Sequence, residues 1–366
     1  MDFKKIEYQK LLNFTCEIMK GLGYPQSQAE IASKVLVEAD ARGIPSHGVA
    51  RLAFYKKNID GNFTVPEAEP EIVHETPVSV VVDGKSGIGP YISKVTVEKC
   101  LEKAQQSGVC FGSVRNSNHF GIAGFWAELA ARKDMIGMAF TNTRRCGIVT
   151  GGRERLLGTN PIAVAIPRDG GEPFLLDMAT TTVAHGKIEV YDRRNKEMPL
   201  GWAVDEKGKD TTDAHHIEEL FKDRQGGYGG HLYLGGEGEM LGGHKGYGLG
   251  LLVELLCAGL SLGRWSKHTF EGEGSGTTHF FAAFRLDLFG NANDIKKHID
   301  SILTDIQNSE KADGYDRIYI HGEKEWENRE RAMKEGISLD PATCMLLQDF
   351  AQTFNIPWMT LLPFQN

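Results

Sequence analysis

A histidine and an arginine stand four residues apart in the segment Ser46-His47-Gly48-Val49-Ala50-Arg51. This spacing predicts a helix that Ser46 caps at its N-terminus and that carries both side chains on one face. The positive end of a helix dipole favours a neutral imidazole, so His47 could accept a proton near neutral pH. Arg51 offers a planar fork that matches a carboxylate. The pair would suit a small 2-hydroxy or 2-oxo acid; the alternative is a capped surface helix with an ordinary histidine and arginine.

A second histidine, His119, lies between an apolar stretch at 109–114, typical of a buried strand, and a helical pattern. Reactive groups of α/β proteins tend to lie at the carboxyl ends of strands, so His119 is a candidate general acid or base. The alternative is a structural role, because a histidine at the start of a helix can simply satisfy that end of the helix.

Charged side chains follow two further predicted strands. Arg144 and Arg145 come after the stretch 135–141 and offer cations for an anionic substrate or a cofactor phosphate. A solvated pair on a loop is the alternative. Asp177 ends the stretch 174–177 and could orient a histidine by accepting its ring N–H.

Apolar periodicity predicts the elements that position these residues. Three helices are expected in the first sixty residues, the second beginning with a capping box at Ser27 and Glu30. The polar region 192–243 indicates loops around short elements. Further helices are expected at 92–106, 121–133, 245–260, 292–307, 325–334 and 341–354, and strands at 78–84, 109–114, 135–141, 162–166, 174–177 and 280–286.

This order of elements predicts an α/β fold of two domains. We expect both ends of the chain, residues 1–70 and 324–366, to form one helical domain around an inserted α/β domain of residues 71–323. The 43 glycines favour a nucleotide or phosphate site. The sequence has neither G-x-G-x-x-G nor a P-loop, so a dinucleotide would be held in a non-Rossmann manner.

Composition excludes several classes of protein. The net charge of −8 disfavours binding to nucleic acid. No apolar run resembles a membrane span or a signal peptide, so we expect a cytoplasmic protein without a membrane partner. The six cysteines are scattered without a C-x-x-C pair, which indicates reduced thiols. H-E-x-x-H is absent too, and we expect no metal.

Seven short motifs together resemble the type-2 malate/L-lactate dehydrogenase family. Their order and spacing match over nearly the whole chain, although each alone is weak. They are Ser46-His47-Gly48-x-x-Arg51, Asn116-Ser117-Asn118-His119-Phe120-Gly121, Gly158-Thr159-Asn160-Pro161, Leu176-Asp177-Met178-Ala179-Thr180, Gly201-Trp202-Ala203-x-Asp205, Gly242-Gly243-His244-Lys245-Gly246-Tyr247-Gly248 and His321-Gly322-Glu323.

The resemblance implies an NAD(P)-dependent oxidoreductase with a non-Rossmann fold, in which residues 71–323 form the cofactor-binding and catalytic domain. It also implies a homodimer. By resemblance, His47 with Asp177 is an acid/base pair, His119 is the proton-transferring group of other members, and Ser46 and Arg51 contact the substrate. The choice between the two histidines stays open. The segments expected to line the cofactor contain Met178, Ala179, Thr180, His244, Lys245, Gly322 and Glu323.

The segment Thr143-Arg144-Arg145-Cys146 departs from the family pattern, which usually has small residues or proline there. An arginine at this point could meet a second carboxylate, which would favour malate and oxaloacetate over lactate and pyruvate. We therefore expect hydride transfer between NAD and malate, with NADP not excluded.

Three alternatives remain from the sequence. The first is another activity of the same family, on L-lactate, ureidoglycolate, sulfolactate or diketogulonate. The second is a non-catalytic NAD(P)-binding regulator, although such a protein would have little use for paired acid/base groups and a carboxylate clamp. The third is a metal-dependent hydrolase that uses His47 and His119.

Overall fold

A seven-stranded sheet forms the centre of the computed structural model, which describes residues 4–222 and 227–358. The strand order is β2-β3-β4-β12-β5-β8-β9. These strands comprise β2 (Glu71–Thr76), β3 (Ser79–Asp83), β4 (Val109–Ser117), β5 (Met135–Thr141), β8 (Ile162–Ile166), β9 (Phe174–Met178) and β12 (Thr277–Arg285). Within residues 4–222 and 227–358, no helix combines the length and apolar character needed to span a bilayer.

The sheet is mixed, and β3 and β4 are its one parallel pair among the described residues. Because β12 is antiparallel to both β4 and β5, and β9 returns antiparallel to β8, the strands β3, β4, β5 and β9 run in one direction. Their carboxyl ends share one edge of the sheet. That edge carries the polar residues that the sequence places after these strands.

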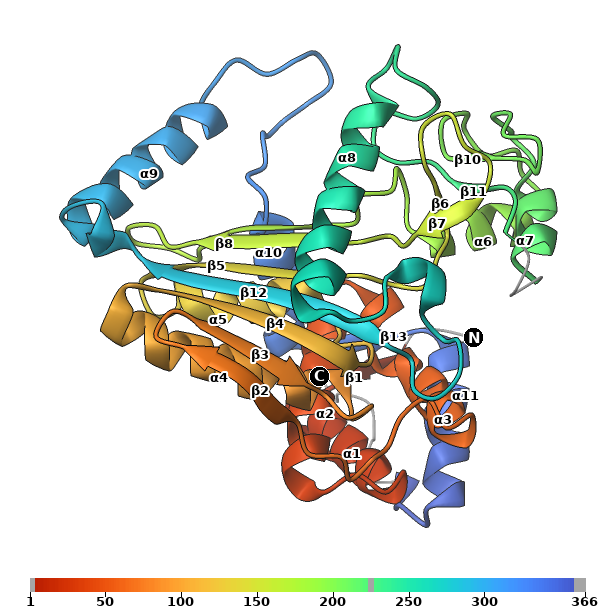
Figure 1. Ribbon diagram of the computed structural model, residues 1–366, viewed down its shortest axis with the longest axis horizontal. Helices are drawn as coiled ribbons and strands as arrows, with labels where there is room; N and C mark the ends of the chain where they lie inside the picture. Colours follow the sequence, from red (N-terminus) through yellow and green to blue (C-terminus); the bar gives the residue numbers. More distant parts are fainter. Residues whose placement is uncertain (1–3, 223–226, 359–366) are drawn as a thin grey trace.

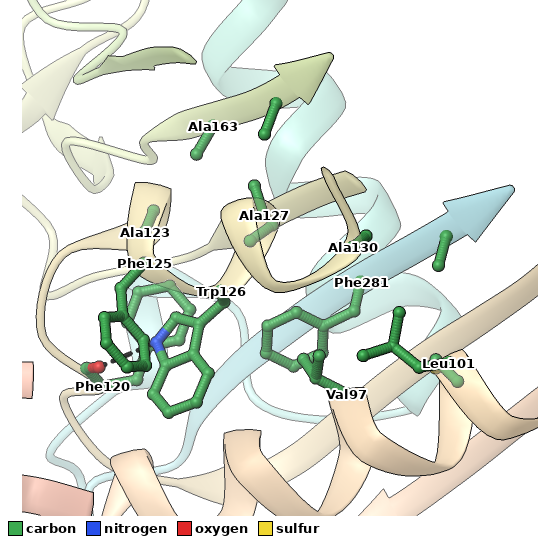
Figure 2. Close-up of a cluster of buried hydrophobic side chains, with 14 of the residues drawn as sticks. Val97, Leu101, Phe120, Ala123, Phe125, Trp126, Ala127, Ala130, Ala163 and Phe281 are labelled. Carbon is green, nitrogen blue, oxygen red and sulfur yellow. Dashed lines mark hydrogen bonds between the residues drawn. The ribbon is translucent and has the colours of Figure 1, made fainter. Parts of the chain in front are cut away.

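Helices α4 (Gly89–Ser107) and α5 (Ala123–Ala131) cover one face of the sheet, as Figure 1 shows. Their apolar residues join Phe281 and the buried Trp126 in a large core cluster, drawn in Figure 2. The Trp126 ring N–H is satisfied, since it donates to the Phe120 carbonyl at 2.9 Å. This cluster makes the sheet and its two helices one rigid support.

The opposite face carries α8 (Gly243–Glu254), which continues into a π-helical turn, η3 (Leu255–Gly259). Val253 and Cys257 pack on Phe140 and Phe280 there. Successive side chains of β12 point to opposite faces of the sheet, so Phe280 and Phe281 pack in different apolar clusters. A single strand therefore contributes to both apolar layers.

The two ends of the chain meet in a helical unit. Strand β1 (Lys4–Ile6) pairs with β13 (Ile337–Leu339), and residues from both ends share one apolar cluster. The domain boundaries given above stay a prediction. The helices of this unit are α1 (Tyr8–Gly21), α2 (Gln26–Ala41), α3 (Leu52–Asp60), α10 (Glu323–Glu335) and α11 (Pro341–Thr353), while α9 (Ala292–Gln307) precedes α10 along the chain.

The polar region between β9 and α8 contains a small four-stranded sheet of order β10-β11-β6-β7. Its strands are short, as the glycine-rich sequence leads one to expect. The elements of this part are β6 (Gly147–Ile148), β7 (Arg155–Leu157), α6 (His185–Arg193), β10 (Ala203–Val204), α7 (Ala214–Lys222) and β11 (Gly230–His231).

Two predicted helix caps are wrong. Residues 45–51 form two 3-10 turns, Pro45–His47 and Val49–Arg51, so Ser46 caps no α-helix and α3 begins only at Leu52. The second helix has Pro25 as its N-cap without a side-chain bond, which places Ser27 inside the helix and removes the expected capping box. The other helices and strands predicted from periodicity are confirmed, with ends shifted by a few residues.

Candidate active site

Two 3-10 turns present His47 and Arg51, because local residues and one carboxylate prevent a continuous helix. Gly48 is extended between the turns, with φ −84° and ψ −159°. The Val49 N–H donates to Asp40 Oδ2 at 2.8 Å. A Cβ on Gly48 would collide with the same Asp40 carboxylate, so this close approach requires glycine. The Asp40 side chain thus fixes the second turn.

The turns bring His47 beside His119, although 72 positions separate them in the sequence. The two rings stack with centroids 5.5 Å apart and an interplanar angle of 26°. His119 Nδ1 lies 3.1 Å from the Tyr55 hydroxyl, which comes from α3. No partner among the described residues bonds the buried His119 Nε2. One ring nitrogen of His119 is therefore held and the other remains available to a ligand.

Burial keeps both rings neutral. It lowers the pKa of His47 to about 4, with the nearby Arg51 charge adding to the effect. The pKa of His119 lies well below its ordinary value, again through burial first and then through the charges of His47 and Arg51. The predicted neutrality of His47 therefore has a different cause from the helix dipole. Arg51 also donates from Nε to the Ser46 carbonyl at 2.5 Å, which fixes its guanidinium.

Buried hydrogen bonds fix the loop that carries His119. Asn118 donates from Nδ2 to three carbonyls, including those of Phe63 at 3.1 Å and Gly87 at 3.0 Å. The adjacent Phe120 ring stacks on the fully buried His279, with centroids 4.5 Å apart. Burial lowers the pKa of His279 to about 3, so this ring is a neutral part of the core.

Asp177 lies in a neighbouring recess of about 250 Å³ and accepts the Gly124 N–H at 2.7 Å. The Asp177 side chain is solvent-exposed, and desolvation by the protein groups around it raises the pKa of its carboxyl to about 6. Among the described residues its hydrogen-bond partner is this amide and not a histidine ring. Two residues that line the recess come from the segments that carry the histidines. Ile44 lies three residues before His47, and Ile122 lies three residues after His119.

The same recess brings Gly322 next to Asp177, as the resemblance implies for residues that line a cofactor. Arg42 also lines it, only 3% exposed, and no described residue bonds its Nη1. A buried guanidinium nitrogen without a partner favours an acceptor-rich ligand such as a nucleotide. The recess of about 250 Å³ therefore fits a polar part of a dinucleotide, such as a phosphate or a ribose.

The other expected cofactor residues divide into two groups. Thr180 is buried and donates to the carbonyls of Thr159 or Asn160 at 3.0 and 3.1 Å, and Glu323 accepts the Ile320 N–H at 2.8 Å, so both side chains hold the protein itself. Met178 and Ala179 are half-buried beside them.

His244 and Lys245 are exposed at the start of α8. A second recess of about 430 Å³, lined by Gly236, Gly238 and Gly243, lies beside them. Glycine-rich backbone next to a helix N-terminus is suited to a phosphate.

Arg144 and Arg145 lie between β5 and β6, at the same edge of the sheet as His119. Arg144 is exposed and Arg145 half-buried. The Arg145 charge contributes to a lowered pKa of Glu271, after the larger effect of His268, so it faces the loop at 264–276. The Ser275 N–H of this loop donates to the Phe63 carbonyl, which also bonds Asn118 next to His119.

Sequence reasoning missed three residues of the site. Tyr55, which contacts His119, and Asp40, which holds the turn before Arg51, belong to no motif. Glu254 lies inside the apolar helix α8, is 3% exposed and accepts from Asn142 at 2.9 Å and Asn160 at 2.8 Å. A charged residue in an otherwise apolar helix was the available signal for Glu254.

The site thus combines two neutral histidines, a fixed arginine and a neighbouring recess lined by Asp177 and Gly322. The family model described as malate/L-lactate dehydrogenase matches residues 6–348. The chain belongs to this family.

Similar proteins agree with this assignment. A malate dehydrogenase of Pyrococcus abyssi is 42% identical over 340 residues, or 92% of this chain and 91% of the relative. An L-sulfolactate dehydrogenase of Methanocaldococcus jannaschii is 37% identical over 88% of this chain and 90% of its own. The crystal structure of malate dehydrogenase from Entamoeba histolytica superposes with a TM-score of 0.92 at 33% identity, covering 99% of this chain and 100% of the other. The mixed α/β fold is thus that of solved malate dehydrogenases.

Proposed function

We propose that the protein is an NAD(P)-dependent dehydrogenase that interconverts malate and oxaloacetate. The observation that carries this proposal is the available Nε2 of His119, held beside His47 and Arg51. A neutral imidazole can take the proton of a substrate hydroxyl, and a fixed guanidinium can bind the adjacent carboxylate. The two relatives named above also act on 2-hydroxy acids that carry a second acidic group, according to their names.

In malate oxidation, Arg51 fixes the carboxylate on C1 and His119 Nε2 accepts the proton of the C2 hydroxyl. This step uses the tautomer in which His119 Nδ1 carries the ring proton and donates it to the Tyr55 hydroxyl, in place of the 3.4 Å hydrogen bond that Nδ1 accepts from the Gly121 N–H in the other tautomer. A nicotinamide cofactor, when bound, would supply the hydride acceptor for this oxidation. Tyr55 holds His119 Nδ1 and so keeps Nε2 directed at the substrate. The Asp177 and Gly322 recess would hold the cofactor, with the Arg42 Nη1 supplying a donor. His47 contributes the second neutral ring, stacked on His119.

The second carboxylate of malate is assigned to Arg144 or Arg145. Both lie at the sheet edge that carries His119, and a second guanidinium there would bind a diacid more strongly than a monoacid. The Arg144→Ala/Arg145→Ala double variant should lose most of its preference for oxaloacetate over pyruvate. Malate activity comparable to wild type in that variant would contradict the assignment.

The first experiment is a substrate panel. Purified protein is offered NADH or NADPH with oxaloacetate, pyruvate, sulfopyruvate and larger 2-oxo acids, while absorbance of the reduced nicotinamide is followed. Rapid oxidation with oxaloacetate supports the proposal and identifies the preferred cofactor. Faster oxidation with another acid supports a different activity of the family. Cofactor binding without any turnover favours a regulator.

We further propose a homodimer in the cytoplasm, where the six buried cysteines stay reduced. The outer side of α8 and the segment after it carry apolar residues that a single chain leaves exposed: Leu249, Leu252, Leu255, Leu260 and Leu262. Phe111, 45% exposed on the central sheet, adds an aromatic ring to the apolar surface. Such a contiguous surface favours burial against a second copy.

Leu252→Asp should lower the molar mass measured by analytical ultracentrifugation from that of two chains towards that of one chain. Met345→Asp, at another exposed apolar position, should leave the molar mass unchanged.

A further inference from the structure

Three potential metal ligands converge between α6 and α7, outside the histidine pair. His185 and Glu189 lie one turn apart on α6, and Glu218 comes from α7. His185 Nε2 is 3.4 Å from Glu218 Oε1 and 4.0 Å from Glu189 Oε1, and ligand atoms of all three lie within 4.8 Å of one another. We propose that these side chains bind a divalent transition-metal ion, with Zn²⁺ as the preferred ion.

The spacing suits a four-coordinate ion. Metal–ligand bonds of about 2.0–2.2 Å place neighbouring ligand atoms of a tetrahedral zinc site roughly 3.4 Å apart. The His185 to Glu218 distance already has this value, and the Glu189 side chain is half exposed, which lets it rotate inward. One imidazole with two carboxylates favours zinc over Mg²⁺ or Ca²⁺, which prefer oxygen ligands alone. Three protein ligands leave the fourth position to water.

One carboxylate oxygen of the cluster, on Glu218, lacks a hydrogen-bond donor. No described residue donates a hydrogen bond to the buried Glu218 Oε1. Burial, followed by the charges of Glu189 and Asp192, raises the pKa of Glu218 to about 7, against the opposing charges of Arg193 and Lys222. Two converging carboxylates repel each other in the absence of a cation. A divalent ion would remove that repulsion.

A second histidine, His231, contacts His185 as an outer partner contacts a metal-bound histidine. His231 is fully buried on β11, and its Nε2 lies 3.0 Å from His185 Nδ1. When His185 donates this proton, its Nε2 lone pair is directed at the two carboxylates. Metal-bound histidines usually donate their other ring N–H to such a partner. An ion here would join α6, α7 and the small sheet. Glu189 also lies near enough to Arg51 for its charge to oppose the burial that lowers the pKa of that guanidinium.

The test uses untagged full-length protein that has been treated with EDTA and dialysed. Calorimetric titration with ZnCl₂ should give one ion per chain, and Zn²⁺ should raise the melting temperature. Co²⁺ should give visible absorption bands of a site with imidazole and carboxylate ligands. Glu189→Gln and Glu218→Gln should each weaken Zn²⁺ binding at least tenfold and remove the Co²⁺ bands, while circular dichroism shows that both variants are folded.

Glu206→Gln is the matched control. It removes an exposed carboxylate that lies 2.7 Å from His216 Nε2, a histidine–carboxylate pair in the same part of the chain without a third ligand. This variant should bind Zn²⁺ as the wild type does. The proposal is overturned if the wild type binds no stoichiometric Zn²⁺, if Glu189→Gln and Glu218→Gln bind it as tightly, or if Glu206→Gln loses it equally.

Discussion

The two histidines of the site differ in what holds them. His119 Nδ1 is fixed by Tyr55 and its Nε2 has no partner among the described residues, whereas His47 Nδ1 contacts the exposed Ser46 hydroxyl at 3.0 Å. A proton acceptor needs a fixed ring with a free nitrogen. Each ring contacts a hydroxyl through Nδ1, but Tyr55 is buried and Ser46 is exposed, so His119 is held more firmly and we propose it as the acid/base group.

His119→Gln should lower kcat for malate oxidation by about 10²- to 10⁴-fold, the range for loss of a general base. The measurement is steady-state kinetics, with NADH fluorescence as a control that the cofactor still binds. His47→Gln keeps the free nitrogen of His119 and should lose much less. An equal loss in both variants would contradict the assignment.

The pH dependence of malate oxidation should reflect the lowered pKa of the buried histidines. A base with a lowered pKa stays unprotonated until the solution is more acidic than usual for imidazole. We therefore expect kcat/KM to remain on a plateau through neutral pH and to fall only below the ordinary imidazole range, since His47 titrates at about 4 and His119 is also shifted down. A midpoint near or above the ordinary value, in protein that recovers full activity when returned to pH 7, would argue against a buried base.

At the scale of elements, α8 depends on a carboxylate at its end. Glu254 accepts from Asn142 after β5, from Asn160 before β8, and from the Ser266 N–H at 2.9 Å. These donors come from segments that the sheet brings to one edge. The buried carboxylate therefore joins the helix to the ends of two strands.

Glu254→Ala should lower the free energy of unfolding by about 3 kcal/mol or more, because several buried donors lose their acceptor at about 1–3 kcal/mol each. Glu254→Gln keeps one acceptor oxygen and should cost less. Urea denaturation measures the difference, and the exposed Glu239→Ala is the control. A loss for Glu254→Ala no larger than for Glu239→Ala would show that the bonds are not needed.

Periodicity predicted elements well where apolar residues alone decide them. The helix expected at 92–106 extends from Gly89 to Ser107, and the strand at 135–141 is confirmed. The turns at residues 45–51 were missed because Asp40, distant from any motif, fixes them through a tertiary hydrogen bond. The site residues with family motifs could be named, but Tyr55 and Glu254 act through contacts that only the folded chain creates.

At the scale of the whole molecule, a buried charge network joins the helical unit to the sheet. Arg42 on α2 lies 2.6 Å from Glu128 on α5 and 3.3 Å from Glu38, which in turn accepts from Arg329 on α10 at 2.8 Å. The Arg42 guanidinium also stacks over Trp326 at 4.6 Å. The network therefore links both ends of the chain with a helix of the central core.

Arg42→Ala should lower the free energy of unfolding by about 3–5 kcal/mol, because it leaves buried carboxylates without their cation. Arg132→Ala is a matched control, since Arg132 lies 2.8 Å from the same Glu128 but is about half exposed, and it should cost no more than about 1 kcal/mol. Both are measured by chemical denaturation. Similar losses for the two arginines would show that burial does not set the strength of this network.

The pairing of β1 with β13 has a consequence for how the protein is made. A ribosome releases Ile6 early, and its partner Ile337 emerges only after the entire central sheet. The cluster beneath His47 and Arg51 includes Leu347 and Phe350 from the same late segment. A nascent chain therefore carries Arg51, the proposed substrate-binding arginine, for most of synthesis without the packing that fixes it. Catalytic competence should arise last, when the final helices close against the first, and should not accumulate in step with chain length.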